Sequence, residues 1–157
     1  MSTVTDPSTS PTRADVTAKI MAMKVAEGWR WEELASLTGQ NPVWTAAALS
    51  GQCALLPDQA KAVAEKFGLD EFETKLLQTY PYRGCMTDTV PTDPFVYRFF
   101  EIMQVYGMAM KDVAQEEFGD GIMSAIDFSI DVDREADPKG DRVKITYSGK
   151  FLPYKQF

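Results

Sequence analysis

Residues 95–107, FVYRFFEIMQVYG, are apolar on nearly every side of a helix, and this segment limits most strongly what the chain can fold into. Arg98 and Glu101 are the only charged residues between Asp93 and Lys111. A helix that is apolar all round is typically buried within a protein instead of lying on its surface. Because the C-terminal half of the chain is short, we expect a second copy of the chain to cover this helix.

The residues that follow predict one more helical stretch and then a β-ribbon. The helical stretch is expected from 108 to about 118, and apolar and polar residues then alternate over 125–133, as in a strand with one solvated face. DPKG at 137–140 predicts a turn, and 142–147 predict a returning strand whose basic residues oppose the acidic ones of the first. SGK at 148–150 predicts a second turn. Two or three such strands are marginally stable alone, so the apolar face of the ribbon must also be covered.

The N-terminal half carries repeated start and stop signals of short helices, with Ser, Thr, Asp, Asn or Pro before each apolar face and Gly after most of them. These signals predict five helices, near 13–26, 31–37, 42–49, 57–67 and 71–80. Residues 31–51 have the spacing of a helix-turn-helix. The fold class expected is therefore mainly α with a small β part (α+β), a lambda-repressor-like helical bundle followed by a helix and a β-ribbon.

Changes in composition predict the domain boundaries. Residues 1–11 are rich in Ser, Thr and Pro and predict a disordered tail. Residues 12–88 form the expected helical bundle, and 89–157 form the expected C-terminal dimerisation domain. A proline-rich connector at 80–94 joins these two domains.

The charged and polar inventory excludes several chemistries. The sequence has no histidine, which removes Ser-His-Asp and Cys-His catalysis, His-ligated zinc and histidine pH switches. With 16 Lys and Arg against 23 Asp and Glu, the net charge is −7, which disfavours nucleic acid and anionic membranes as partners. We expect no metal and no organic cofactor, because no motif for either is present.

Cysteine usage and hydropathy indicate a cytoplasmic location. Cys53 and Cys85 are too few for a disulfide framework and are interpreted as small buried apolar residues. No apolar run is long enough for a membrane span, and the first residues lack the apolar core of a signal peptide.

Three polar residues are the candidates for chemistry. Arg98 and Glu101 stand three apart on one helical face, where a guanidinium covered by a partner would bind a small anion; the alternative is an ordinary surface ion pair. Ser124 is expected where a helix gives way to a strand, a place where backbone amides are free to bind an anion; the alternative is an ordinary turn serine.

A non-catalytic anion-binding assembly protein is one further interpretation. A helix-turn-helix DNA-binding regulator is another, although residues 41–51 contain neither Lys nor Arg.

Several segments, in order along the chain, resemble the cyanase (cyanate hydratase, or cyanate lyase) family. They are RGC at 83–85, PTDP at 91–94, YRFFEIMQVYG at 97–107, FGDGIMSAIDF at 118–128, DPKG at 137–140 and GKFLPYKQF at 149–157. The resemblance implies a bicarbonate-dependent reaction of cyanate that gives carbamate and CO2, after which carbamate gives ammonia and CO2. Such a reaction serves cyanate detoxification and nitrogen supply.

The resemblance also implies functional residues and an assembly. The catalytic residues of the family fall on Arg98, Glu101 and Ser124, and the contacts of its anion pocket fall on three apolar residues, Ile122, Ala125 and Leu152. The family forms a homodecamer of five dimers with active sites shared between subunits. Bicarbonate is then a second substrate, and no cofactor is required. Asp127 departs from those relatives that carry an uncharged amide at this position.

Overall fold

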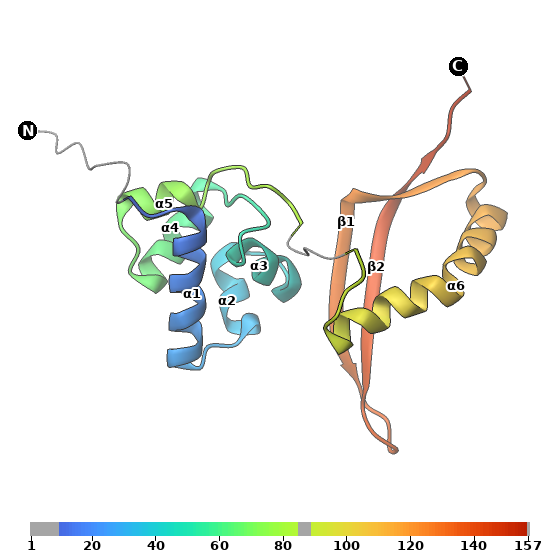
Figure 1. Cartoon of the computed structure of the whole chain (residues 1–157), viewed down its shortest axis with the longest axis horizontal. Coiled ribbons are helices and arrows are strands. Elements are labelled where there is room, and N and C mark those ends of the chain that lie inside the picture. The colour runs from blue at the N-terminus through green and yellow to red at the C-terminus, as the bar shows by residue number, and fades with distance from the viewer. Residues whose placement is uncertain (1–9, 85–88, 157) are drawn as a thin grey trace, which may run out of the picture. The chain divides into compact units, whose positions relative to one another are not determined.

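The computed structural model describes residues 10–84 and 89–156. The chain divides into two compact units, Met1–Gly84 and Cys85–Phe157, and each is described by itself (Figure 1). Most of the tail expected at 1–11 lies outside the described residues, as does Cys85. The domain boundaries expected from composition stay a prediction.

The described residues of the first unit, 10–84, form five helices, as the sequence predicts. They are α1 (Arg13–Glu27), α2 (Trp31–Thr38), α3 (Pro42–Leu49), α4 (Pro57–Phe67) and α5 (Glu71–Leu76). The expected caps are present: the side chains of Thr12, Asn41 and Asp70 each accept a backbone N–H in the first turn of α1, α3 and α5. The fifth helix ends at Leu76, earlier than its apolar pattern suggests.

The helices of the first unit enclose one apolar core. Its buried members come from all of α1 to α4 and from the segments beside them, namely Val16, Ile20, Leu34, Ala48, Leu49, Leu55, Ala60, Val63, Phe67 and Leu77. Thr38 and Thr45 are buried with them, and their hydroxyls share a hydrogen bond of 2.7 Å between α2 and α3. Cys53 is half-buried against this core.

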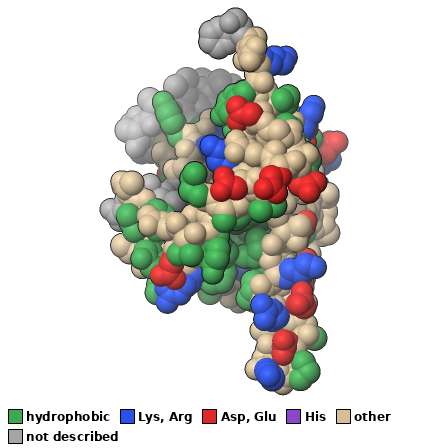
Figure 2. Space-filling model, turned by 90° about the vertical axis from the view of Figure 1, so that its right-hand side faces the viewer, with side chains coloured by type: hydrophobic (Ala, Val, Ile, Leu, Met, Phe, Trp, Pro, Cys, Tyr) green, Lys and Arg blue, Asp and Glu red, His purple; other side chains and the backbone are tan. Residues whose placement is uncertain are grey.

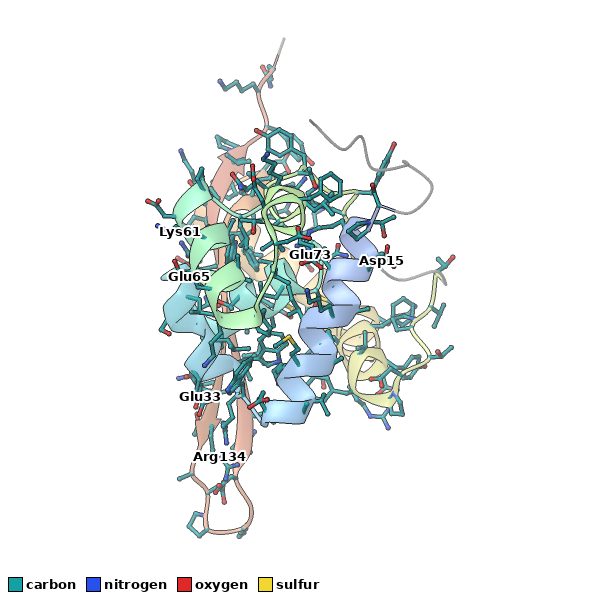
Figure 3. All side chains as sticks on the ribbon, turned by 90° about the vertical axis from the view of Figure 1, so that its left-hand side faces the viewer. Asp15, Glu33, Lys61, Glu65, Glu73 and Arg134 are labelled. Atoms are coloured by element: carbon teal, nitrogen blue, oxygen red, sulfur yellow. The ribbon has the colours of Figure 1, made fainter. Side chains whose placement is uncertain are left out.

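Charged side chains of the first unit lie on its outside. Figure 3 shows Lys61 and Glu65 on the outer face of α4, away from the core. Glu73 is the most enclosed of the ion-paired carboxylates, and it holds Lys19 of α1 at 2.9 Å. This contact links α1 to α5.

The second unit begins with a single long helix, α6 (Pro94–Phe118). Asp93 caps it by accepting the N–H groups of Phe95 and Val96. The sequence favours a separate helical stretch from 108, and the structure corrects this because the helix continues through Gly107 without a break. One glycine weakens a helix by only about 1 kcal/mol, which the neighbouring helix formers offset.

Two antiparallel strands complete the unit, β1 (Gly121–Glu135) and β2 (Arg142–Pro153). The turn expected at 137–140 lies between them, where Gly140 donates its N–H to the carbonyl of Asp137. Opposite charges face each other as expected: Asp133 of β1 pairs with Lys144 of β2 in the register. The second turn expected at SGK is wrong, since β2 runs straight through 148–150. Strand β1 also begins at Gly121, four residues before the alternating pattern starts.

The surface of the second unit is largely apolar in one chain. The sequence predicts that α6 is buried all round, yet no residue of α6 is buried here. Val105, Met108, Val113 and Phe118 are each more than half exposed. Figure 2 shows one side of the molecule, where hydrophobic side chains gather on the surface, and basic and acidic side chains follow the projecting end of the ribbon. No helix in the described part of the chain is long and apolar enough to cross a membrane.

Candidate active site

Ser124 is the one buried residue among the described residues of the second unit, with 6% of its surface exposed. Its Oγ accepts the backbone N–H of Ile126 at 3.1 Å and that of Asp127 at 3.0 Å. The sequence places Ser124 at a junction between helix and strand, and the structure corrects this because Ser124 lies within β1. Backbone amides are indeed present beside it, but these two bind Ser124 itself.

The strand around Ser124 is irregular. Met123 pairs with Phe151 and Phe128 pairs with Gly149, so four residues of β1, 124–127, lie opposite Lys150 alone. Such an insertion is a β-bulge, which bends the strand and redirects side chains. The bulge contains the first residues of the alternating pattern, 125–127, and Ile126, an apolar member of that pattern, is 98% exposed.

The other three predicted pocket residues lie beside Ser124. Ile122 and Leu152 are directly opposite each other in the register of β1 and β2. Both are partly exposed, at 48% and 40%. Ala125 follows Ser124 in the bulge and is exposed. The structure therefore brings four of the six predicted site residues to one end of the ribbon.

The end of α6 is tied to the same end of the ribbon. The rings of Phe118 and Phe151 stack with centroids 5.3 Å apart, and Tyr154 donates its N–H to the carbonyl of Asp120 at 3.0 Å. These contacts join the helix to β2 at the pocket residues. They also account for the crowding at Gly121, where a side chain would collide with the Phe151 ring.

Arg98 and Glu101 lie near the start of α6, and both are exposed in one chain. No ion pair or hydrogen bond joins them to each other or to Ser124 within residues 10–84 and 89–156. The interpretation as a surface ion pair is therefore not supported. Their apolar neighbours Phe95, Ile102 and Val105 are 59%, 43% and 64% exposed, so the two charges stand on an uncovered apolar surface.

The described residues contain no group of three or more Cys, Asp and Glu side chains placed to hold a metal ion. The polar group that the ribbon offers is instead the Ser124 hydroxyl, whose oxygen already accepts the N–H groups of Ile126 and Asp127. Its O–H can donate a hydrogen bond to an anion. With a guanidinium added, the hydroxyl could also stabilise negative charge that develops during a reaction.

Gly149 is a residue of the site that sequence reasoning missed. A Cβ at this position would overlap the carbonyl oxygen of Ser124 and lie 2.5 Å from Met123 Cγ. The available signal was a glycine within SGK, next to an otherwise alternating strand. That signal was interpreted as a turn, because a turn and a close backbone approach both favour glycine.

Comparison with protein families covers both units. The family model described as the cyanate lyase C-terminal domain matches residues 88–156. The model described as cyanate hydratase, N-terminal, matches residues 13–81. The chain belongs to the cyanate lyase family.

Members of the cyanate lyase family are similar to this chain over nearly its whole length. A cyanate hydratase of Variovorax paradoxus is 52% identical over 145 residues, which are 92% of this chain and 99% of that protein. A cyanate hydratase of Synechococcus sp. (strain CC9311) is 51% identical over 148 residues, 94% of this chain and 99% of that protein. The resemblance found in the sequence is thereby confirmed.

A solved structure in the cyanate lyase family supports the fold. The crystal structure of cyanase from T. urticae superposes with a TM-score of 0.78 at 34% identity, and covers 88% of this chain and 97% of that one. The expected α+β class is confirmed, with α1 to α6 and the ribbon of β1 and β2. The roles of the individual site residues stay predictions.

Proposed function

We propose that this chain is a cyanate hydratase, which decomposes cyanate in a bicarbonate-dependent reaction. The reaction gives carbamate and CO2, and carbamate then gives ammonia and a second CO2. The observation that carries the proposal is the match of both family models, over residues 13–81 and 88–156. The names of the relatives, cyanate hydratases at about half identity, support the same activity. Its biological use would be cyanate detoxification and nitrogen supply.

The proposed chemistry begins with a problem of charge, because both substrates are small monoanions. A bicarbonate oxygen attacks the carbon of cyanate, and the product is a dianionic mixed anhydride that loses CO2. Arg98 and Ser124 would stabilise this dianion by charge and by hydrogen bonding. The proton of bicarbonate and one further proton from solvent must reach the cyanate nitrogen to give carbamate, and Glu101 would transfer a proton to it. Bicarbonate supplies the nucleophile, so the reaction as written needs no cofactor.

The anion would be enclosed by the apolar residues Ile122, Ala125 and Leu152. Their position beside the buried Ser124 supports this role. Apolar walls exclude water, and charge interactions are stronger where water is excluded. A pocket of this kind would help one guanidinium offset the repulsion between two anions.

We also propose that the active site is shared between subunits of a homo-oligomer, a decamer built from five dimers. Two features of α6 support this: none of its residues is buried in one chain, and Arg98 makes no hydrogen bond with Ser124 among the described residues. A partner subunit that covered α6 could supply both the burial and the missing neighbours. The location proposed for the assembly is the cytoplasm.

The test is ammonia release from cyanate by the purified full chain, with and without bicarbonate. We expect activity only with bicarbonate. Arg98→Leu and Ser124→Ala should each lower turnover at least about 100-fold, since each removes a group that stabilises the dianion. Matched controls are Arg134→Leu and Ser148→Ala, which change the same residue types at exposed positions of β1 and β2.

Light scattering on each variant checks the mass of the assembly. A mass near that of one chain for the active wild-type protein would contradict the shared site. Full activity in both Arg98→Leu and Ser124→Ala would contradict the residue assignment. If no ammonia forms under any condition, the enzymatic proposal itself is wrong.

A DNA-binding function is not proposed. The second helix of the helix-turn-helix, α3, has the sequence PVWTAAAL and offers no Lys or Arg to phosphates or guanine bases.

A further inference from the structure

We propose that Gly149 is a positioning residue for Ser124, and that it holds the Ser124 hydroxyl as a hydrogen-bond donor toward the anion. The inference deepens the proposed function and rests on it. It concerns how the ribbon builds the site within one chain, before any partner subunit is added. It follows from three observations on β1 and β2.

The first observation is the close approach of the two strands at the bulge. Gly149 lies beside the bulge, at the position paired with Phe128. A Cβ there would collide with the Ser124 carbonyl oxygen, which is backbone, and with Met123 Cγ. The Met123 side chain is flexible and could move aside, but the carbonyl could move only if the bulge moved. Gly149 therefore allows the backbone of Ser124 to pack directly against β2.

The second observation is the burial of Ser124. Every other described residue of the second unit is at least partly exposed, whereas Ser124 is 6% exposed. Ile126, two residues further along the same bulge, is 98% exposed. The bulge thus turns one small polar side chain inward while its neighbours face outward. The close approach of Gly149 to the Ser124 carbonyl holds the bulge backbone that carries this side chain.

The third observation is the hydrogen bonding of the Ser124 hydroxyl. A serine Oγ has two acceptor sites and one O–H donor. The N–H groups of Ile126 and Asp127 occupy both acceptor sites, at 3.1 and 3.0 Å. The remaining hydrogen-bonding capacity of Ser124 is its O–H, which donates. The oxygens of a carboxylate-like dianion can only accept hydrogen bonds, so they need a donor such as this O–H. Ser124 therefore acts as an anion-binding hydroxyl and not as a nucleophile.

The experiment compares Gly149→Ala with the wild-type full chain in the ammonia assay. The added methyl group must displace the Ser124 backbone, and a displacement of about 1 Å in a catalytic group costs on the order of 100-fold in rate. We expect kcat to fall by about that factor. The double variant Gly149→Ala with Ser124→Ala should lose little beyond Ser124→Ala alone, because both changes act through the same hydroxyl.

Gly140→Ala is the matched control. Gly140 has φ of 125° in the turn between the strands, and its Cβ would meet nothing within 4 Å. The substitution strains the ribbon far from Ser124, so we expect lower stability with kcat retained. If Gly140→Ala and Gly149→Ala lower kcat equally, Gly149 has a general structural role and the proposal fails. If the fall in kcat of the double variant equals the product of the two single falls, the two residues act independently and the proposal also fails.

Amide hydrogen exchange gives a readout that does not depend on activity. In the wild-type assembly, the N–H groups of Ile126 and Asp127 should exchange slowly, although the register gives neither residue a partner on β2. In Ser124→Ala they should exchange at least about tenfold faster, because the acceptor is gone. Fast exchange in the wild type overturns the proposal even if Gly149→Ala does not fold. If the wild type is inactive but these amides are protected and respond to both substitutions, the proposed function fails while the positioning geometry stands.

Discussion

Ile122 and Leu152 lie directly opposite each other in the antiparallel pair of β1 and β2, and Ile122 comes two residues before the buried Ser124. Their side chains are partly exposed in one chain, so this pair presents an apolar surface next to the serine hydroxyl. A small anion bound by Ser124 would meet that surface. The register of the ribbon thereby links two distant parts of the sequence in one candidate pocket.

The first prediction concerns this apolar pair. Leu152→Ala should lower kcat/KM by about tenfold, because a shortened side chain admits water and weakens the charge interactions in the pocket. The measurement is steady-state ammonia release at saturating bicarbonate. Val143→Ala, on the same strand and 62% exposed, is the control and should retain activity. Equal losses in the two variants would show that the effect belongs to the ribbon as a whole.

The second prediction concerns the geometry of the cation at position 98. Arg98→Lys keeps the positive charge but replaces a planar, bidentate donor with a point charge. If Arg98 binds the dianion through two parallel hydrogen bonds, kcat should fall by about tenfold or more even though the charge is retained. Arg134→Lys is the control, in an exposed ion pair with Asp141 at 3.0 Å. Full activity of Arg98→Lys would mean that charge alone suffices.

The third prediction concerns the core of the N-terminal unit. Phe67 is 1% exposed and packs edge-on against Trp29 with ring centroids 5.3 Å apart. Phe67→Ala should lower the free energy of unfolding of this unit by about 3 to 5 kcal/mol, through lost burial and a cavity. All three tryptophans lie in this unit, so fluorescence in guanidinium follows its unfolding alone. Phe72→Ala on α5, 47% exposed in the wild type, should cost about 1 kcal/mol or less.

The fourth prediction concerns pH. The backbone N–H and the hydroxyl of Thr12 both donate to Asp15 Oδ2 at 2.7 Å. The backbone hydrogen bond, followed by that of the hydroxyl, holds the pKa of Asp15 below its ordinary value of 3.8. A carboxyl with a lowered pKa in the folded state stabilises the fold above its unfolded-state pKa. That stabilisation is lost as the pH falls through the folded-state pKa.

Asp15→Asn should therefore destabilise the N-terminal unit at pH 7, and the difference from the wild type should shrink as the pH is lowered below 3.8. Guanidinium unfolding followed by tryptophan fluorescence measures it. The control is Glu65→Gln on the outer face of α4 (Figure 3), where the described part of the chain provides no hydrogen bond or ion pair. A difference that grows below pH 3.8 would have the wrong sign for this mechanism.

Local sequence signals predicted the helices of the first unit well. Thr12, Asn41 and Asp70 stand at the caps where they were expected, because a cap needs only an oxygen near the first free amides. The continuity of α6 through Gly107 could not be predicted in this way. A single glycine is a weak local penalty, and the rest of the helix decides whether it stays helical.

The sequence named candidate residues for the site, whose roles stay predictions, but it did not show how the ribbon is built around Ser124. Arg98 and Glu101 stood out as charges within an apolar helix, and the family resemblance pointed to Ser124. The bulge at 124–127 and the close approach of Gly149 were missed. Both depend on which residues of two strands lie opposite each other, and register is a property of the pair of strands.

The sequence by itself determined the positions and caps of the N-terminal helices, the alternation of the strands, the absence of histidine chemistry and the resemblance to one family. These follow from local hydrogen bonding, hydrophobic periodicity and composition, which act over a few residues. Only the tertiary structure decided that Ser124 is buried in a β-bulge, with its hydroxyl bound by the amides of Ile126 and Asp127 and its carbonyl close to Gly149. That arrangement depends on packing between segments about 25 residues apart in the chain, where one missing Cβ sets how closely two backbones can approach.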